Sequence, residues 1–282
     1  MTEEKNKIVG GTLYVVSTPI GNLADMSERA IKTLSEVDFI AAEDTRNTLR
    51  LLMSLGISKT LVSYHEHNKH EAGERITQRL LSGESCALVT DAGTPAISDP
   101  GEELVALCAQ SSIPVTGVPG ACALIDALAL SGLPTRRFVF EGFLPVKSKE
   151  RKERLAALKR EARTFILHEA PHKLRGTLDD LCSALGENRR IALCRELTKL
   201  NEEVQRCTLG EAVRVYAERE PRGEYVLVIE GGTVADTQEA TMSPLEAVAY
   251  YEKSGMSKND AIKAAAKLLG IPRNEVYKLT IG

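Results

Sequence analysis

Tryptophan is absent from this 282-residue chain, and the other aromatic residues are only seven tyrosines and five phenylalanines. So few rings disfavour a protein that reads single-stranded nucleic acid by stacking many bases on aromatic side chains. Long apolar runs are also missing. Apolar runs such as residues 225–229 fall far short of the roughly 18 residues that cross a bilayer. The polar N-terminal stretch has no signal-peptide core, so we expect a cytoplasmic protein without a membrane segment.

An excess of positive charge is absent as well. Lysine and arginine number 36 against 39 aspartates and glutamates, a net charge of −3. No overall positive field therefore draws the chain to nucleic acid, and any RNA contact must be local. The six cysteines form no C-x-x-C pair and lie mostly inside apolar runs. They indicate reduced packing residues, not zinc ligands or a disulfide framework.

Short β-rich apolar runs alternate with longer amphipathic segments in the first half of the chain. This alternation predicts an α/β fold built of βαβ units on a parallel sheet. The first helix should be capped by Asp25 or Ser27. The expected strands cover residues 12–17, 38–43, 61–65, 86–90 and 114–118, and the expected helices cover about 26–37, 45–55, 69–81, 101–110 and 121–130.

A second α/β set follows the pattern FVFEGFLP and a charged stretch. We expect an N-terminal α/β domain over residues 10–140, a C-terminal α/β domain over 141–232, and a helical tail over 243–282 after a polar linker. The second set contains strand-like runs at 164–170, 190–197, 202–209 and 224–232, with a helix at 171–185 and a short one after 209.

The tail is expected to form three short helices. Ala266, Gly270 and Val276 occupy the small, turn and apolar positions of a helix-turn-helix, with Pro272 opening the last helix. From Lys253 onward the tail carries six basic and two acidic residues. Two interpretations are equally open: a nucleic-acid contact module, or a helical hairpin that closes a core or a subunit interface.

Three loops rich in glycine and proline follow predicted strands at residues 17–25, 91–100 and 117–124. In parallel α/β sheets, ligands bind outside the carboxyl ends of the strands, where glycine permits close approach to the backbone. The loop at 91–100 exceeds the two to six residues that such connections usually have. Together the loops predict one ligand pocket. Because neither a Walker motif nor G-x-G-x-x-G is present, nucleoside triphosphates and ordinary dinucleotides are disfavoured.

The strings STPIGN, AAEDTR, HEHN, DAGTP with SDPG, GVPG, EGFLP and RELTK occur in this order. In order and spacing they resemble the ribosomal RNA small subunit methyltransferase I family, of the tetrapyrrole methylase type, over about residues 10–232. The resemblance implies two α/β domains with S-adenosylmethionine folded in the cleft between them. It also implies 2'-O-methylation of a cytidine, position 1402, in the 16S ribosomal RNA of the small subunit, and a homodimer.

The resemblance also implies which residues line the donor site. Tetrapyrrole methylases carry Gly-Asp-Pro where this chain has Ala92-Gly93-Thr94, so a contact through that aspartate is not expected. A cleft of small residues and backbone groups, with no phosphate loop, suits a sulfonium nucleoside better than ATP. The first domain would contribute Pro19, Asp91, Gly93, Thr94, Ile97, Ser98, Cys122 and Ala123, and the second Glu169, Leu197 and Val226.

A ribose hydroxyl must lose its proton during methylation, so a carboxylate or a histidine should lie near it. Candidate bases are Glu43, Asp44 and His67, with Arg46 orienting a phosphate or a carboxylate. Asp44 precedes a predicted helix, and the role of helix N-cap is favoured over the catalytic one. His65, His67 and His70 fall within six residues, but the chemistry needs no metal, and no metal is expected. A substrate-facing loop or a solvated turn are the two interpretations of this string.

Residues 147–163 contain eight basic and three acidic residues on a predicted amphipathic helix with Leu155, Ala156, Leu158 and Ala162 as its apolar face. Such runs are usually solvated faces. The resemblance adds weight to an RNA backbone contact through Lys149, Arg151 and Lys152. Two other functions stay open: a small-molecule methyltransferase of the tetrapyrrole type, and a non-catalytic RNA-binding assembly factor.

Overall fold

The computed structural model describes residues 6–232, 243–269 and 271–281. The chain divides into two compact units. The first consists of Met1–Leu130 together with Cys194–Glu203, and the second of Ser131–Leu193 with Val204–Gly282. A short segment from the second half of the sequence therefore belongs structurally to the first unit.

The first unit contains a five-stranded sheet in the order β3-β2-β4-β1-β5. Each of its strand pairs is parallel, which confirms the predicted βαβ arrangement. Parallel strands direct all five carboxyl ends to the same edge, so the loops after them gather there. The strands are β1 (Leu13–Val16), β2 (Phe39–Ala42), β3 (Thr60–Ser63), β4 (Cys86–Val89) and β5 (Val115–Val118).

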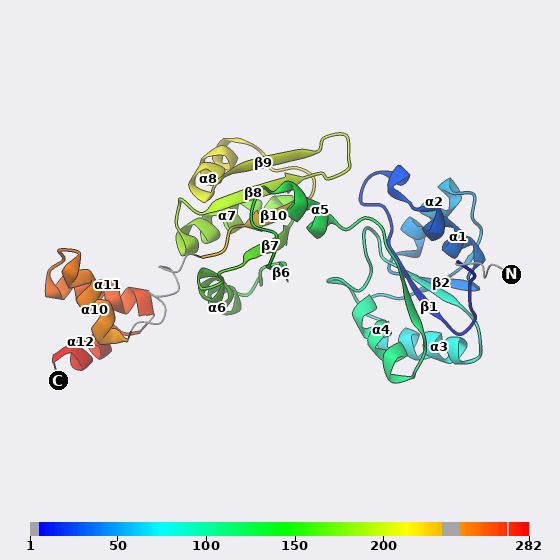
Figure 1. Cartoon of the computed structure of the whole chain (residues 1–282), viewed down its shortest axis with the longest axis horizontal. Coiled ribbons are helices and arrows are strands. Elements are labelled where there is room, and N and C mark those ends of the chain that lie inside the picture. Colours follow the sequence, from blue (N-terminus) through cyan, green and yellow to red (C-terminus); the bar gives the residue numbers. More distant parts are fainter. Residues whose placement is uncertain (1–5, 233–242, 270, 282) are drawn as a thin grey trace. The chain divides into compact units, whose positions relative to one another are not determined.

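Helices cover both faces of this sheet (Figure 1). One buried cluster joins α1 and α2 to the sheet, and a second joins α3 and α4 to its other face. The side chain of Ser27 caps α1, which is one of the two predicted alternatives. The helices are α1 (Glu28–Glu36), α2 (Thr45–Ser54), α3 (Lys69–Leu81), α4 (Gly101–Gln110) and α5 (Ala123–Leu130), with a short 3-10 helix, η1 (Leu23–Asp25), before α1.

The sheet of the second unit has the order β6-β7-β10-β8-β9 and mixed directions. β7 runs parallel to β6 and antiparallel to β10, so fewer carboxyl ends meet at one edge than in the first sheet. The strands are β6 (Phe138–Gly142), β7 (Thr164–Glu169), β8 (Arg190–Arg195), β9 (Glu203–Thr208) and β10 (Tyr225–Ile229).

Three helices pack with this sheet into one buried cluster: α6 (Ser148–Lys159), α7 (Pro171–Leu185) and α8 (Leu209–Glu218). Two of the four residues expected on the apolar face of α6 are buried. Leu155 and Leu158 are buried in the cluster, whereas Ala156 is exposed and Ala162 lies beyond the end of the helix. The charged run is longer than the helix because Arg160 already forms its C-cap.

The tail consists of the three predicted helices, α10 (Pro244–Lys253), α11 (Lys258–Leu269) and α12 (Arg273–Ile281). They bury a small core of their own, which includes Ala266 and Val276 from the predicted helix-turn-helix pattern. Gly270, the predicted turn residue, lies outside the described residues. The six cysteines are free, and burial raises the pKa of the Cys108 thiol to about 11. None of the described helices is long and apolar enough to cross a membrane.

Candidate functional site

The loops after β1 and β4 are paired at the carboxyl edge of the first sheet. Thr18 and Gly93 form an isolated antiparallel bridge, with backbone N–H···O distances of 2.9 and 3.1 Å. The Thr18 hydroxyl also donates to the carbonyl of Thr90 at 3.1 Å. Gly93 has a φ of 84°, a left-handed conformation that glycine adopts without steric cost. The two loops therefore form one rigid piece.

A chain of hydroxyl contacts extends this piece to the loop before α5. The Ser17 and Thr94 hydroxyl oxygens lie 3.0 Å apart, and Thr94 Oγ1 donates to the carbonyl of Ala121 at 3.0 Å. A Cβ atom on Gly120 would lie 2.9 Å from Cβ of Ser17, closer than two such carbons pack. Short polar contacts thus join three of the strand-end loops at the edge where the sequence predicts a ligand pocket.

Backbone strain concentrates in two of the loops. Five residues other than glycine in the described ranges have positive φ, and four of them are Ala96, Ser98, Glu196 and Thr198. Such conformations cost roughly 1–3 kcal/mol each and persist where the surroundings impose them, often at ligand sites. The first pair belongs to the long loop after β4. The second pair belongs to the connection from β8 to β9, which is part of the first unit.

Asp99 and Tyr64 hold the long loop in place. Oδ1 of Asp99 accepts hydrogen bonds from the backbone N–H groups of Ala96 and Gly101, at 3.0 and 2.7 Å. Burial raises the pKa of the Asp99 carboxyl. The buried ring of Tyr64 donates its hydroxyl proton to the carbonyl of Pro100 at 3.0 Å, and burial raises the pKa of that hydroxyl to about 12. The loop is therefore fixed at both ends of its final turn.

A cavity of about 440 Å³ lies within the first unit, next to these loops. Burial raises the pKa of Asp126 in its wall, and the carboxylates of Asp25 and Glu202 raise it further. The hydroxyl oxygen of Thr198 is buried without a hydrogen-bond partner among the described residues. A ligand with a net positive charge and a hydrogen-bond donor fits such a lining. The cavity is lined by Asp25, Ala121, Asp126, Ala129, Leu130, Leu197, Thr198 and Glu202.

The structure brings most of the expected donor residues of the first unit to these loops. Leu197, expected from the second domain, lies in the first unit and shares the cavity wall with Ala121. Ala121 directly precedes Cys122 and Ala123, which are both partly buried. Side chains of the long loop reach the solvent, among them that of Ile97, which is 45% exposed. Pro19 and Gly93 lie in the paired loops, and Asp91, Thr94, Ile97 and Ser98 in the long loop.

Asp91 joins the loops to α2. Its Oδ1 accepts from the backbone N–H of Asp44, and its Oδ2 from the side-chain amide of Asn47, both at 3.2 Å. The side chain stays exposed and keeps lone pairs for another donor.

Glu169 and Val226 lie in the second unit, on the neighbouring strands β7 and β10. The Glu169 carboxylate is buried, and both of its oxygens accept hydrogen bonds within the protein. The donors are the backbone N–H of Ala170, at 2.9 Å, and the hydroxyl of Thr177. Val226 is almost fully buried in the strand. The donor-binding role of these two residues stays a prediction.

Glu43 and Asp44 follow β2 and differ in their surroundings. The side chain of Asp44 accepts a hydrogen bond from the backbone N–H of Arg46 at 2.8 Å and caps α2, which is the role that the sequence favours. The Arg46 guanidinium bonds both oxygens of Asp44 and holds the pKa of that carboxyl far below its ordinary value. So weak a base is poorly suited to take a proton near neutral pH. Oε2 of Glu43 instead accepts from the Thr90 hydroxyl at 2.6 Å, which fixes its orientation.

The histidine string follows β3 at the same edge. Asn68 closes the turn by accepting from the N–H of His65 and donating to the carbonyl of Ser63. The rings of His65 and His67 stand edge to face with centroids 5.9 Å apart, and His67 is exposed. Nδ1 of His65 is buried and has no partner among the described residues. Over the same ranges, no three His, Cys, Asp or Glu side chains are placed to hold a metal ion.

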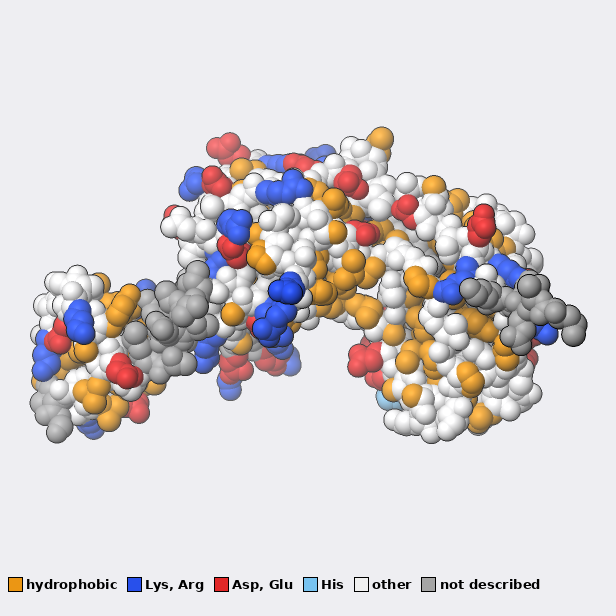
Figure 2. Space-filling model, in the orientation of Figure 1, with side chains coloured by type: hydrophobic (Ala, Val, Ile, Leu, Met, Phe, Trp, Pro, Cys, Tyr) orange, Lys and Arg blue, Asp and Glu red, His pale blue; other side chains and the backbone are white. Residues whose placement is uncertain are grey.

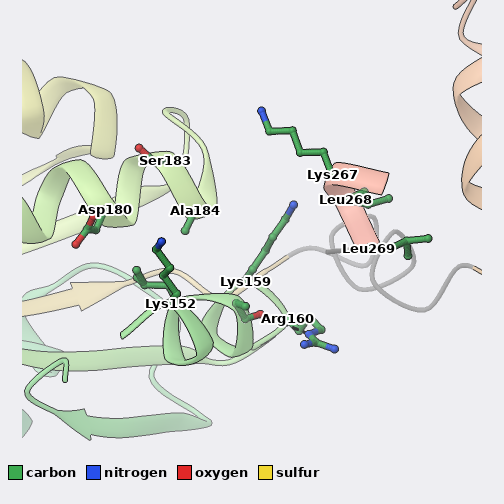
Figure 3. Close-up of a pocket in the computed structure, with 11 residues that line it drawn as sticks. Lys152, Lys159, Arg160, Asp180, Ser183, Ala184, Lys267, Leu268 and Leu269 are labelled. Carbon is green, nitrogen blue, oxygen red and sulfur yellow. Dashed lines mark hydrogen bonds between the residues drawn. The ribbon is translucent and has the colours of Figure 1, made fainter. Parts of the chain in front are cut away.

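The basic residues of α6 separate into two kinds. Arg151, expected as an RNA contact, is bound inside the second unit: Nε pairs with Asp180 at 2.6 Å and Nη2 donates to Thr177 at 2.8 Å. Lys152, Lys159 and Arg160 instead line a surface cavity beside α7 (Figure 3). On the face of the second unit that Figure 2 shows, basic and acidic side chains are interspersed. Arg151 is therefore a clamp between α6 and α7, and the expected contact is reduced to the lysines.

Two residues that line the cavity, Thr198 and Asp126, are not predicted from the sequence. Thr198 belongs to the motif RELTK, of which only Leu197 is an expected donor contact. Asp126 lies in the first turn of α5, where nothing in the sequence distinguishes it from a solvated helix carboxylate.

Comparison with known proteins gives a family and close relatives. The family model described as Tetrapyrrole (Corrin/Porphyrin) Methylases matches residues 12–213. A protein of Synechocystis sp. called ribosomal RNA small subunit methyltransferase I is 46% identical over 272 residues, 96% of this chain and 98% of the relative. A protein of the same name from Halalkalibacterium halodurans is 48% identical over 273 residues, 95% of this chain and 94% of the relative.

A solved structure extends the likeness to the fold. Uroporphyrin-III C-methyl transferase from Thermus thermophilus, complexed with S-adenyl homocysteine, superposes with a TM-score of 0.55 at 16% identity. The match covers 78% of this chain and 97% of that one. The expected α/β fold class is confirmed.

Proposed function

The chain belongs to the ribosomal RNA small subunit methyltransferase I family of tetrapyrrole methylases, and from this membership we propose that it methylates the 2'-oxygen of a cytidine, position 1402, in 16S ribosomal RNA. Full-length similarity supports this activity, because the relatives align over 94 to 98% of their own length. The protein would act in the cytosol, on the small subunit and as a homodimer, as the resemblance implies.

S-adenosylmethionine is the methyl donor, and when bound it supplies a methyl group on a sulfonium sulfur. The loops of the first unit fit this molecule. Its net charge is positive, and the adjoining cavity is lined by Asp25, Asp126 and Glu202. Backbone carbonyls and the partnerless Thr198 hydroxyl oxygen suit its ammonium group and its ribose hydroxyls.

Glu43 is the proposed general base. It lies at the carboxyl end of β2, and the Thr90 hydroxyl holds Oε2. Oε1 accepts no hydrogen bond from the described residues, so it is available for the proton of a ribose hydroxyl. Asp44 serves the helix and the loop, and the exposed His67 is proposed as an RNA contact. Correct placement of the reacting hydroxyl would supply much of the rate of this in-line displacement.

The test is transfer of a labelled methyl group to small ribosomal subunits from a strain that lacks this modification. We expect one labelled nucleotide per subunit, mapped as a 2'-O-methylcytidine. Subunits that already carry the methyl group are the control and should take up no label. Label in a tetrapyrrole but not in RNA would support the small-molecule alternative, and donor binding without transfer to either would contradict the proposal. A protein that binds RNA but no donor would be the assembly factor.

A further inference from the structure

Phe143 is the most exposed of the twelve aromatic side chains, at 58%. It directly follows β6, in the connection that leads to α6. Single exposed apolar residues are common on protein surfaces and need no explanation by themselves. The surroundings of this ring, however, set it apart from a mobile surface residue.

The backbone on both sides of Phe143 is anchored. The register of β6 against β7 shifts between Phe140 and Gly142, and such a bulge redirects the side chains that follow it. Leu144 is buried in the core of the second unit. Nη1 of Arg151 donates to the carbonyl of Pro145 at 3.3 Å, which ties the connection to α6. The ring is thus held outward by a fixed backbone.

Two further rings back Phe143. The ring of His168 stands edge to face with that of Phe143, with centroids 5.7 Å apart at 77°. The His168 ring also stands edge to face with the ring of Phe140, with centroids 5.1 Å apart and an interplanar angle of 62°. Burial lowers the pKa of His168, which favours the neutral ring. Its Nε2 atom is buried without a partner among the described residues. The stack therefore ends in one solvent-facing ring on a rigid aromatic base.

His168 of the stack lies beside Val226, one of the positions of the second unit that the resemblance assigns to the donor. The two residues pair in the ladder of β7 and β10, so their side chains share one face of the sheet, whereas Glu169 belongs to the opposite face. A methyl acceptor must come within about 3–3.5 Å of the reacting group, so a surface that holds the acceptor base belongs close to the donor. Lys147, four residues after Phe143, is exposed and pairs at the surface with Glu150 at 3.3 Å, a contact that a phosphate can replace.

We propose that Phe143, backed by His168 and Phe140, stacks on a base of the RNA substrate at or next to the methylated nucleotide. This assignment rests on the proposed function and names a substrate contact for it. A single platform suffices, because the enzyme would need to hold one flipped-out base and not read a long strand.

The absence of tryptophan makes the contact directly observable. Phe143→Trp introduces a single tryptophan, which can be excited apart from the tyrosines, and its emission should be quenched saturably by a cytidine-containing single-stranded RNA. An oligomer of the same length and charge with abasic sites should bind through its phosphates and leave the emission unchanged. Quenching by neither strand, while anisotropy of a labelled strand shows binding, would overturn the proposal.

Methyl transfer gives the second measurement. Phe143→Ala should raise the KM for small subunits by about 5- to 150-fold, the range expected for one lost base–aromatic stack. Phe143→Tyr should restore it, and calorimetry should show unchanged donor binding. Val146→Ala is the control, since that side chain is 78% exposed and aliphatic.

Two outcomes would contradict the assignment: an equal effect of Val146→Ala, or a change of oligomeric state in Phe143→Ala, which would identify a protein contact. If the wild type methylates no RNA, the proposed function fails. The fluorescence experiment would still report whether the ring stacks on a base.

Discussion

The two sheets present different surfaces at the carboxyl ends of their strands. In the first unit all strands are parallel, and polar contacts such as those of Thr94 and Thr18 join the loops into one rigid edge. In the second unit the sheet is mixed, the strand-end carboxylate of Glu169 is already bonded, and Phe143 faces the solvent. A fixed polar cradle suits a small charged ligand of constant shape, whereas an exposed ring suits one base of a flexible strand. This difference supports the two proposals, that the first edge binds the donor and that Phe143 stacks on a base of the acceptor.

The largest expected effect is at Glu43. Glu43→Gln keeps the size of the side chain and the contact with Thr90 but removes the proposed base. We expect kcat for methyl transfer to fall by about 10²- to 10⁴-fold with donor affinity unchanged. Glu74→Gln, on the exposed face of α3, is the matched control. An undiminished kcat in Glu43→Gln would remove the base from this edge.

The rigidity of the first edge is tested at two glycines, Gly117 in β5 and Gly120 in the loop after it. A Cβ on Gly120 would press against Ser17, whereas one on Gly117 would meet nothing within 4 Å. Overpacking costs about 1–3 kcal/mol, so we expect Gly120→Ala to lower donor affinity about 5- to 150-fold by calorimetry. Gly117→Ala should bind as the wild type does. Equal affinities would show that the loop spacing does not shape the donor site.

Two substitutions on α6 separate a basic residue with a structural role from one that faces the substrate. Arg151→Ala should lower the free energy of unfolding in urea by about 1.5–3 kcal/mol, because it removes charged hydrogen bonds to Asp180 and Thr177. Lys152→Ala should leave stability unchanged but weaken RNA binding and flatten its dependence on salt. The opposite pattern would show that Arg151 faces the RNA.

The smallest effect is expected at Asp44. Asp44→Asn keeps an N-cap and should retain stability and activity, whereas Asp44→Ala loses the cap and some thermal stability. Because the folded pKa lies below the ordinary 3.8, the contribution of the carboxylate is present above about pH 4 and is lost as the pH falls. The difference in Tm between wild type and Asp44→Ala should therefore shrink in acid. An inactive but stable Asp44→Asn would make Asp44 the base.

The arrangement of secondary structure was predictable from periodicity and turn residues. The helices at 69–81, 101–110 and 171–185 have the predicted bounds, since each begins after a turn and carries a clear apolar face. Side-chain partners were not predictable. Nothing local in the sequence shows that Arg151 binds Asp180, or that residues 194–203 group with the first unit. The predicted domain boundaries at 140 and 232 stay predictions.

For the candidate site, the sequence predicts which loops take part but not which side chains contact one another. The glycine and proline content of residues 17–25, 91–100 and 117–124 identified the edge, because backbone geometry depends on those residue types. The roles of Glu43 and Asp44 depend on which side chain meets Thr90 and which meets Arg46, and that is set by packing between distant segments. For the same reason, the number of aromatic residues does not show which of them, such as Phe143, is exposed.

A crystal structure with S-adenosylhomocysteine tests the assignment of the donor to the first edge most directly. We expect the ligand to contact residues 91–98, the loop at 119–123 and the Thr198 hydroxyl. A ligand bound away from all three would contradict it.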